Sequence, residues 1–119
     1  GNIEKNVSIS IYLKPDTGSE RVVEIEDDLK KNSAVASVEY IDKDRALEKF
    51  SNDNKDDPII ANALDEIGEN PLLSSLVIKA KNQKDYNQLA KYVEDNFGDD
   101  INNINYGKNK DVIDRLGKI

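Results

Sequence analysis

The chain has 119 residues, with 17 Lys and Arg against 24 Asp and Glu and a formal net charge of -7. It contains no His, Cys, Met or Trp, which excludes Ser–His–Asp and Cys–His catalysis, thiolate zinc sites, haem or iron–sulfur ligation and disulfide bonds. Its length fits one domain, alone or with a small extra lobe, and its acidic balance argues against a nucleic-acid partner.

Hydrophobic residues make up 37% of the chain and are too regularly placed for a disordered sequence. No stretch approaches the roughly 20 apolar residues of a membrane-spanning helix. The chain opens on the polar pair Gly1-Asn2 rather than on a signal peptide. We therefore expect a folded domain with neither a membrane-spanning helix nor a signal peptide.

The first third of the chain reads as strand, helix and strand. Apolar residues alternate from Val7 to Leu13, which predicts a strand with one buried face. After turn residues, Ser19 is expected to cap a helix that Asn32 and Ser33 end. A second strand is expected over 35–41. The apolar stripe of the helix comprises Val22, Ile25 and Leu29, with Val23 at its edge.

The segment 42–70 predicts two short helices, which we call the helical lobe. Asp42 is expected to cap the first helix, followed by an acidic break over 51–57. Asp57 and Pro58 suit the start of the second helix, and Gly68 suits its end. The apolar members are Ala46, Leu47 and Phe50 in the first helix and Ile60, Leu64 and Ile67 in the second.

The last third repeats the first pattern. A strand is expected over 75–81, a helix over 85–96 and a strand over 101–106, with Gly98 to Asp100 as the stop between the last two. A short amphipathic helix is expected after Gly107. The apolar residues of the two helices are Tyr86, Leu89, Ala90, Val93 and Phe97, then Val112, Ile113 and Leu116.

The two strand–helix–strand halves resemble each other in sequence. Val35-x-x-Val38-x-Tyr40 and Ile101-x-x-Ile104-x-Tyr106 share residue classes and spacing. Two such halves favour an α+β fold, a ferredoxin-like antiparallel sheet with both helices on one face and the helical lobe inserted. The predicted units are 1–41 and 71–107 for the halves, 42–70 for the lobe and 108–119 for the terminal amphipathic helix.

The acidic residues could in principle form a calcium loop or a catalytic carboxylate pair. Asp53, Asp56 and Asp57 lie close in sequence, but Lys55 interrupts them and Pro58 occupies the position where an EF-hand loop needs Gly. A glycosidase pair would need an aromatic cleft, for which two Phe and five Tyr offer little material. No phosphate-binding glycine loop is present. We therefore predict no catalytic residue, no metal site and no cofactor.

The helical lobe holds more apolar side chains than two short helices can bury against each other. Either these side chains pack on the open face of the sheet, or part of them stays exposed as a partner-binding patch. The candidate partner-binding residues are Phe50, Ile59, Ile60, Leu64, Ile67, Leu72 and Leu73. A hinge is expected at Asp42, Asn70 and Pro71.

Three motifs in order resemble one known family. Residues 38–50 (VEYIDKDRALEKF) are similar to the second strand and following helix of the extracytoplasmic domain of FtsX, the permease-like cell division protein. Residues 70–76 (NPLLSSL) resemble its Asn-Pro-Leu-Pro segment, with Leu73 where many relatives carry a second Pro. Ile104 to Gly107, then Val112 to Leu116, resemble the stretch that leads to the second membrane helix of that family.

The resemblance implies a function. Members of this family are four-helix membrane proteins that pair with a cytoplasmic ATPase, FtsE, in an ABC-like complex. Their large loop lies on the extracytoplasmic side of the bacterial membrane and binds a peptidoglycan hydrolase or a coiled-coil activator of one. The helical lobe is the usual partner surface. We therefore expect a non-enzymatic relay of ATP-driven motion, and homodimerisation of the full-length protein stays open.

Two alternatives remain from the residues themselves. One is a small soluble ligand-binding or regulatory module with a ferredoxin-like fold. The other is carboxylate-based hydrolysis of cell-wall sugar, which ranks below it.

Overall fold

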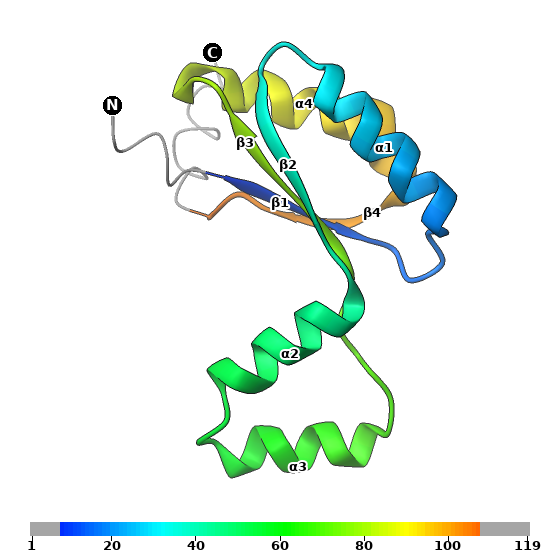
Figure 1. Ribbon diagram of the computed structural model, residues 1–119, viewed down its shortest axis with the longest axis vertical. Helices are drawn as coiled ribbons and strands as arrows, with labels where there is room; N and C mark the ends of the chain where they lie inside the picture. Colours follow the sequence, from blue (N-terminus) through cyan, green and yellow to red (C-terminus); the bar gives the residue numbers. More distant parts are fainter. Residues whose placement is uncertain (1–7, 108–119) are drawn as a thin grey trace.

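A computed structural model describes residues 8–107, which form a four-stranded sheet, two helices that cover it and two helices that project from it (Figure 1). The elements in chain order are β1 (Ile9–Leu13), α1 (Ser19–Lys31), β2 (Val35–Ile41), α2 (Lys43–Asp53), α3 (Pro58–Ile67), β3 (Ser75–Ala80), α4 (Tyr86–Phe97) and β4 (Ile101–Asn105), with the 3₁₀ turns η2 (Gln83–Asp85) and η3 (Gly98–Asp100) flanking α4.

The sheet confirms the ferredoxin-like expectation. Its strand order is β2-β3-β1-β4 and every neighbouring pair is antiparallel. α1 and α4 lie on one face and leave the other face open (Figure 1). The register pairs Ser10 with Asn105 and Tyr12 with Ser75, so β1 begins where β4 ends and finishes where β3 begins. The described chain therefore enters and leaves the sheet at one end, while the helical lobe joins it at the other.

The repeated spacing of the two halves has a structural cause. Val35 pairs with Ala80 and Ser37 with Lys79, so Ala36 is an extra residue in β2. In β4 the pairing likewise skips Asn102. Such a bulge returns the residue three positions on to the same face of the strand. The i, i+3, i+5 apolar pattern of both edge strands thus points toward the helices despite the period of two.

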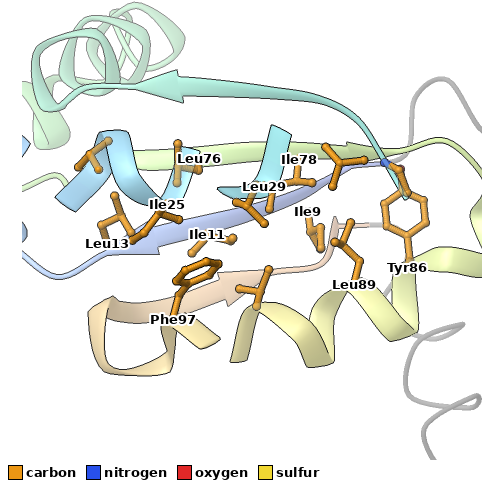
Figure 2. Packing of buried hydrophobic residues seen from close by; sticks show 14 residues of the cluster. Ile9, Ile11, Leu13, Ile25, Leu29, Leu76, Ile78, Tyr86, Leu89 and Phe97 are labelled. Carbon is orange, nitrogen blue, oxygen red and sulfur yellow. The ribbon is translucent and has the colours of Figure 1, made fainter. Parts of the chain in front are cut away.

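The core lies between the sheet and the two covering helices (Figure 2). It confirms the predicted stripes of α1 and α4, but not Val23, which is 52% exposed. Inside this apolar layer the Tyr86 hydroxyl accepts a hydrogen bond from the Ala80 N–H at 3.2 Å. The buried side chains are those of Ile9, Ile11, Leu13, Val22, Ile25, Leu29, Val35, Leu76, Ile78, Ala80, Tyr86, Leu89, Ala90, Val93 and Phe97.

Two polar contacts join the covering helices to their surroundings. The Arg21 guanidinium donates to Asp100 at 3.0 and 2.9 Å and lies 5.6 Å from the centre of the Phe97 ring. Its bonds to Asp100 raise the pKa of Arg21. The Tyr92 hydroxyl of α4 donates to Asp28 of α1 at 2.6 Å, which raises the pKa of Tyr92. These contacts fix α1 and α4 relative to each other and to β4.

The predicted ranges 75–81, 85–96 and 101–106 differ from β3, α4 and β4 by one residue at one or both ends, and two further predicted helix boundaries are wrong. Ser19 is the first residue of α1 rather than its cap, because Gly18 holds the extended N-cap position without a side-chain bond. α2 continues to Asp53 instead of ending at Ser51, because Lys49 pairs with Asp53 one turn on at 3.0 Å and Asn54 caps the last turn through Phe50 O. The expected amphipathic helix over 108–119, like Val7, lies outside the described residues.

The helical lobe projects from the point where β2 ends and β3 begins, away from α1 and α4 (Figure 1). The radius of gyration is 15.7 Å, above the roughly 13 Å of a compact domain near this size. The lobe does not extend the core, since neither of its helices contains a buried residue.

Candidate partner-binding surface

The two lobe helices form because their ends are satisfied locally. The Asp42 carboxylate accepts from Arg45 N at 2.8 Å, and that of Asp57 accepts from Ile59 N at 3.0 Å. Pro58 lies in the first turn of α3, where its missing N–H costs nothing. Gly68 ends α3 in the left-handed conformation at φ 76°, which other residues adopt with strain. These four predicted signals are confirmed.

Apolar side chains of the lobe stand in solvent. Ile59 is 78% exposed, Ile67 51% and Phe50 36%. Together with Val23 on α1, they are the large hydrophobic residues that are most exposed in the described part of the chain. Isolated exposed apolar residues are ordinary, but three of them on two adjacent short helices form a candidate contact surface.

A groove of about 570 Å³ separates α2 from α3. Leu47 contributes to its wall from α2, and Ile60 and Leu64 from α3; all three are half-buried. We call this the inter-helix groove. Its lining is completed by Ser51, Asn54, Lys55, Ala61, Asp65, Gly68, Glu69 and Asn70.

The connection between sheet and lobe, which we call the neck, is held by side chains. The Asn70 amide donates to Lys43 O at 2.8 Å, and its oxygen accepts from Leu72 N at 2.9 Å. The Arg45 guanidinium donates to Tyr40 O at 2.9 Å and pairs with Glu39 at 3.2 Å. The outgoing and the returning chain are thus hydrogen-bonded to each other at the point where the lobe begins.

The structure places the predicted partner-binding residues in three settings. Phe50, Ile59 and Ile67 are exposed, and Ile60 and Leu64 line the groove. Leu72 and Leu73 are half-buried in the segment that returns to β3, outside both lobe helices and outside the groove lining. The structure therefore gathers five of the seven on α2 and α3.

Sequence reasoning missed several residues of this surface. Leu47 was assigned to the apolar stripe of α2 but not to the site, although it shares a helix face with Phe50 three residues on. Asp65 and Glu69 at the groove, and Arg45 at the neck, read as ordinary solvated charges. Whether such a residue lies at the groove or at the neck depends on how the lobe helices pack in space, which no local sequence pattern predicts.

The negative charge of the chain is concentrated in the lobe. Residues 42–70 contain nine Asp and Glu against four Lys and Arg, a net charge of -5. They thus hold most of the formal charge of -7 in about a quarter of the chain. The groove lining itself combines the two carboxylates Asp65 and Glu69 with the single ammonium of Lys55.

Other surfaces of the described residues offer less. Between residues 8 and 107 no three acidic side chains come together as a metal site. The open face of the sheet carries the half-buried side chains of Tyr12, Ile41 and Val77 among Ser, Asn, Lys and Glu. In the same range, no helix is long and apolar enough to cross a membrane.

The fold and the surface define a class: an antiparallel α+β scaffold that carries a capped, acidic helical lobe with exposed apolar side chains. The sequence model of the family described as the FtsX extracellular domain matches residues 6–119. The chain belongs to this family, whose members are extracellular domains of the membrane cell division protein FtsX.

Relatives and solved structures agree with this assignment. Cell division protein FtsX of Bacillus anthracis is 28% identical over 115 residues, 96% of this chain and 36% of that protein. Cell division protein FtsX of Pseudomonas putida is 31% identical over 78 residues, 66% of this chain and 22% of that protein. The chain thus spans about a third or less of the length of these relatives.

Two solved domains share the fold. A crystal structure of extracellular domain 1 of FtsX from Streptococcus pneumoniae, in complex with undecyl-maltoside, superposes with a TM-score of 0.66 at 21% identity, over 84% of this chain and 93% of that one. A solution structure of the large extracellular loop of FtsX from Streptococcus pneumoniae gives 0.64 at 18% identity, over 86% of this chain and all of that one.

Proposed function

We propose that this domain is a non-catalytic docking module whose helical lobe binds a peptidoglycan hydrolase or a coiled-coil activator of one. One observation carries the proposal: α2 and α3 contribute no buried residue to the domain, and the hydrophobic core is formed entirely by residues outside them. Helices that a core does not need, but that are individually capped and expose Ile59, Ile67 and Phe50, are suited to contact another molecule.

The proposal divides the chain by role. Residues 8–41 and 71–107 would form the scaffold and residues 42–70 the partner surface, while residues 108–119, outside the described part, would lead toward a membrane segment of the full-length protein. β1 begins and β4 ends at the end of the sheet opposite the lobe. Motion delivered from the membrane side would therefore cross the whole sheet before it reaches the partner.

The neck is where such motion would change the orientation of the lobe. Asp42, Asn70 and Pro71 are proposed as the pivot. The bond from Asn70 to Lys43 O ties the returning chain to the first turn of α2, so that both connections turn together. In the full-length protein the cytoplasmic ATPase FtsE would supply the motion through the membrane part.

A related structure supports an apolar contact surface in this fold. The Streptococcus pneumoniae domain was solved in complex with undecyl-maltoside, an amphiphile with an eleven-carbon alkyl chain. An alkyl chain associates with exposed apolar surface because it thereby leaves water.

Charge substitution within the lobe tests the proposal. Phe50→Asp and Ile59→Asp each place a carboxylate on the proposed surface, while Val23→Asp does the same to an exposed apolar residue of α1. Each purified variant is tested for retention of the peptidoglycan hydrolases and coiled-coil activators of the source bacterium, with circular dichroism and thermal unfolding as folding controls.

We expect the two lobe variants to lose partner retention by tenfold or more, with unchanged spectra, and Val23→Asp to bind like the wild type. Equal retention by all four proteins would contradict the proposal. Unfolding of Phe50→Asp would leave Ile59→Asp, the more exposed position, to decide.

A further inference from the structure

The charge around the inter-helix groove restricts the chemistry of its occupant. Six carboxylates of the lobe neither cap a helix nor form an ion pair with any residue between 8 and 107: Asp44, Glu48, Asp56, Asp65, Glu66 and Glu69. Two of them, Asp65 and Glu69, line the groove directly. Lys55 is the one cation in this lining, so the carboxylates around the groove outnumber it and favour an occupant that brings further cations.

The same charge disfavours two other occupants. A second copy of this lobe, in a symmetric contact of like surfaces, would bring two segments of charge -5 together. A membrane surface rich in anionic lipid would repel the lobe for the same reason. The scaffold lacks this bias, because residues 8–41 and 71–107 hold twelve acidic and eight basic residues over a length more than twice that of the lobe.

The dimensions of the groove indicate the shape of the occupant. α2 has 11 residues and α3 has 10, so each is about 15 Å long at 1.5 Å per residue. A helix of two to three turns presents apolar side chains at i, i+3 or i+4 and i+7, which span about 10 Å. Its flanking positions would then face Asp65 of α3 and Glu69 just beyond it, the two carboxylates in the groove lining.

We infer that the inter-helix groove is built for an amphipathic helix of a partner protein whose apolar stripe is flanked by Lys or Arg. This inference rests on the proposed docking function and adds the chemistry of the docked segment. Leu47, Ile60 and Leu64 would contact the apolar stripe, while Asp65 and Glu69 would face its cations. Charge complementarity of this kind raises the association rate and discriminates among partners more than it adds raw affinity.

Two synthetic helices test the inference without the natural partner. Both are 18-residue peptides with the same Leu stripe; one carries Lys at the flanking positions and its twin carries Glu. Binding of each labelled peptide to the 119-residue chain is followed by fluorescence anisotropy at about 0.15 M and about 1 M salt. We expect the Lys peptide to bind about tenfold more tightly at low salt, and the preference to shrink at high salt because exposed charges are screened.

Matched variants assign the preference to the groove. Asp65→Lys combined with Glu69→Lys should abolish or reverse it. Asp16→Lys combined with Asp99→Lys, which changes the net charge equally on the scaffold, should leave it intact; all four side chains are exposed. The inference is overturned if the Glu twin binds as well as the Lys peptide, or if both double variants lose the preference to the same extent.

The outcome is separable from that of the proposed function. If the hydrolase or activator is retained through Phe50 and Ile59 but the peptides bind equally, only the chemistry of the occupant is wrong. If the peptides discriminate and no hydrolase or activator is retained, the groove binds basic helices but the proposed function falls.

Discussion

Two tyrosine hydroxyls show how single polar groups support an otherwise apolar scaffold. The Tyr86 ring is buried between sheet and helix, and its hydroxyl accepts from Ala80 N near the end of β3 (Figure 2). The Tyr92 hydroxyl is more accessible and donates from α4 to Asp28 of α1. The first contact satisfies a buried donor, whereas the second joins two exposed surfaces.

Tyr86→Phe should therefore lower the free energy of unfolding by about 1–3 kcal/mol, because the Ala80 N–H loses its side-chain acceptor inside the core. Tyr12→Phe is the control, since Tyr12 lies half-exposed on the open face of the sheet. Urea unfolding measures both. Equal stability of the two variants would show that the buried hydroxyl contributes nothing.

The Tyr92–Asp28 contact predicts a dependence on alkaline pH. The pKa of Tyr92 is raised in the folded chain by its bond to Asp28, above an unfolded value of about 10. The contact is therefore fully present below about pH 10 and is lost as the pH rises through the folded pKa. Tyr92→Phe should be less stable than the wild type by about 1 kcal/mol or less at pH 7.

Urea unfolding of wild type and Tyr92→Phe from pH 7 to pH 11 measures this difference. It should shrink toward the alkaline end, as the hydroxyl loses its proton. A difference that stays constant over the whole range would mean that the hydroxyl acts without titrating.

At the scale of single residues, the sequence predicts what depends on neighbours a few positions away. Asp42, Asp57, Pro58 and Gly68 act in the predicted way because caps involve one turn of chain. Val23 was misplaced because a stripe of three apolar residues does not define its own edge. The partners Tyr92 and Asp28 are 64 positions apart, and no local pattern connects them.

At the scale of elements, α2 and α3 depend on their caps rather than on burial. Helices of 10 or 11 residues are marginal in water without packing. Neither contains a buried residue, so we expect both to open more easily than α1 or α4. The lobe is thus the part of the described chain that a partner can stabilise most.

Asp57→Ala should destabilise α3 by about 1 kcal/mol, because the first turn loses the acceptor for Ile59 N. The effect should stay in the lobe. Amide hydrogen exchange should become faster in α3 and remain unchanged in α1 and α4. Asp56→Ala is the matched control, an adjacent exposed carboxylate that caps nothing. Faster exchange across α1 and α4 as well would mean that the lobe supports the scaffold.

The neck predicts a coupled orientation of lobe and scaffold. Asn70→Ala removes the bond to Lys43 O and the acceptor for Leu72 N. Because the chain has no Cys, spin labels on Ala63→Cys and Lys84→Cys report one distance between lobe and scaffold. The distance distribution from electron paramagnetic resonance should broaden in Asn70→Ala. An unchanged distribution would mean that the two hydrogen bonds of Asn70 do not fix the orientation of the lobe.

The order and type of elements were predictable, since period-two and helical stripes alternate clearly along the chain. The pattern did not predict the bulges at Ala36 in β2 and Asn102 in β4. The i, i+3, i+5 spacing that both strands share is nevertheless a consequence of these bulges. The direction in which the lobe projects was equally hidden. The same apolar residues would fit a lobe folded onto the open face of the sheet.

At the scale of the whole molecule, the core that stabilises the fold and the proposed contact surface lie in separate parts of the chain. The core runs along the whole sheet under α1 and α4, from Ile9 at one end to Leu13 and Leu76 at the other, and the lobe stands outside it, beyond the point where β2 ends and β3 begins (Figure 1). This separation is why charge substitutions on the lobe can change binding while the scaffold stays folded. It also makes the open face of the sheet the main competing surface for a partner.

Amide hydrogen exchange of the chain with and without the proposed hydrolase or activator tests the account most directly. We predict protection confined to α2, α3 and the residues between them, with β1 and β3 unchanged. Protection of β1 and β3 around Tyr12 and Val77, with no change in α2 and α3, would contradict the claim that the helical lobe is the docking surface.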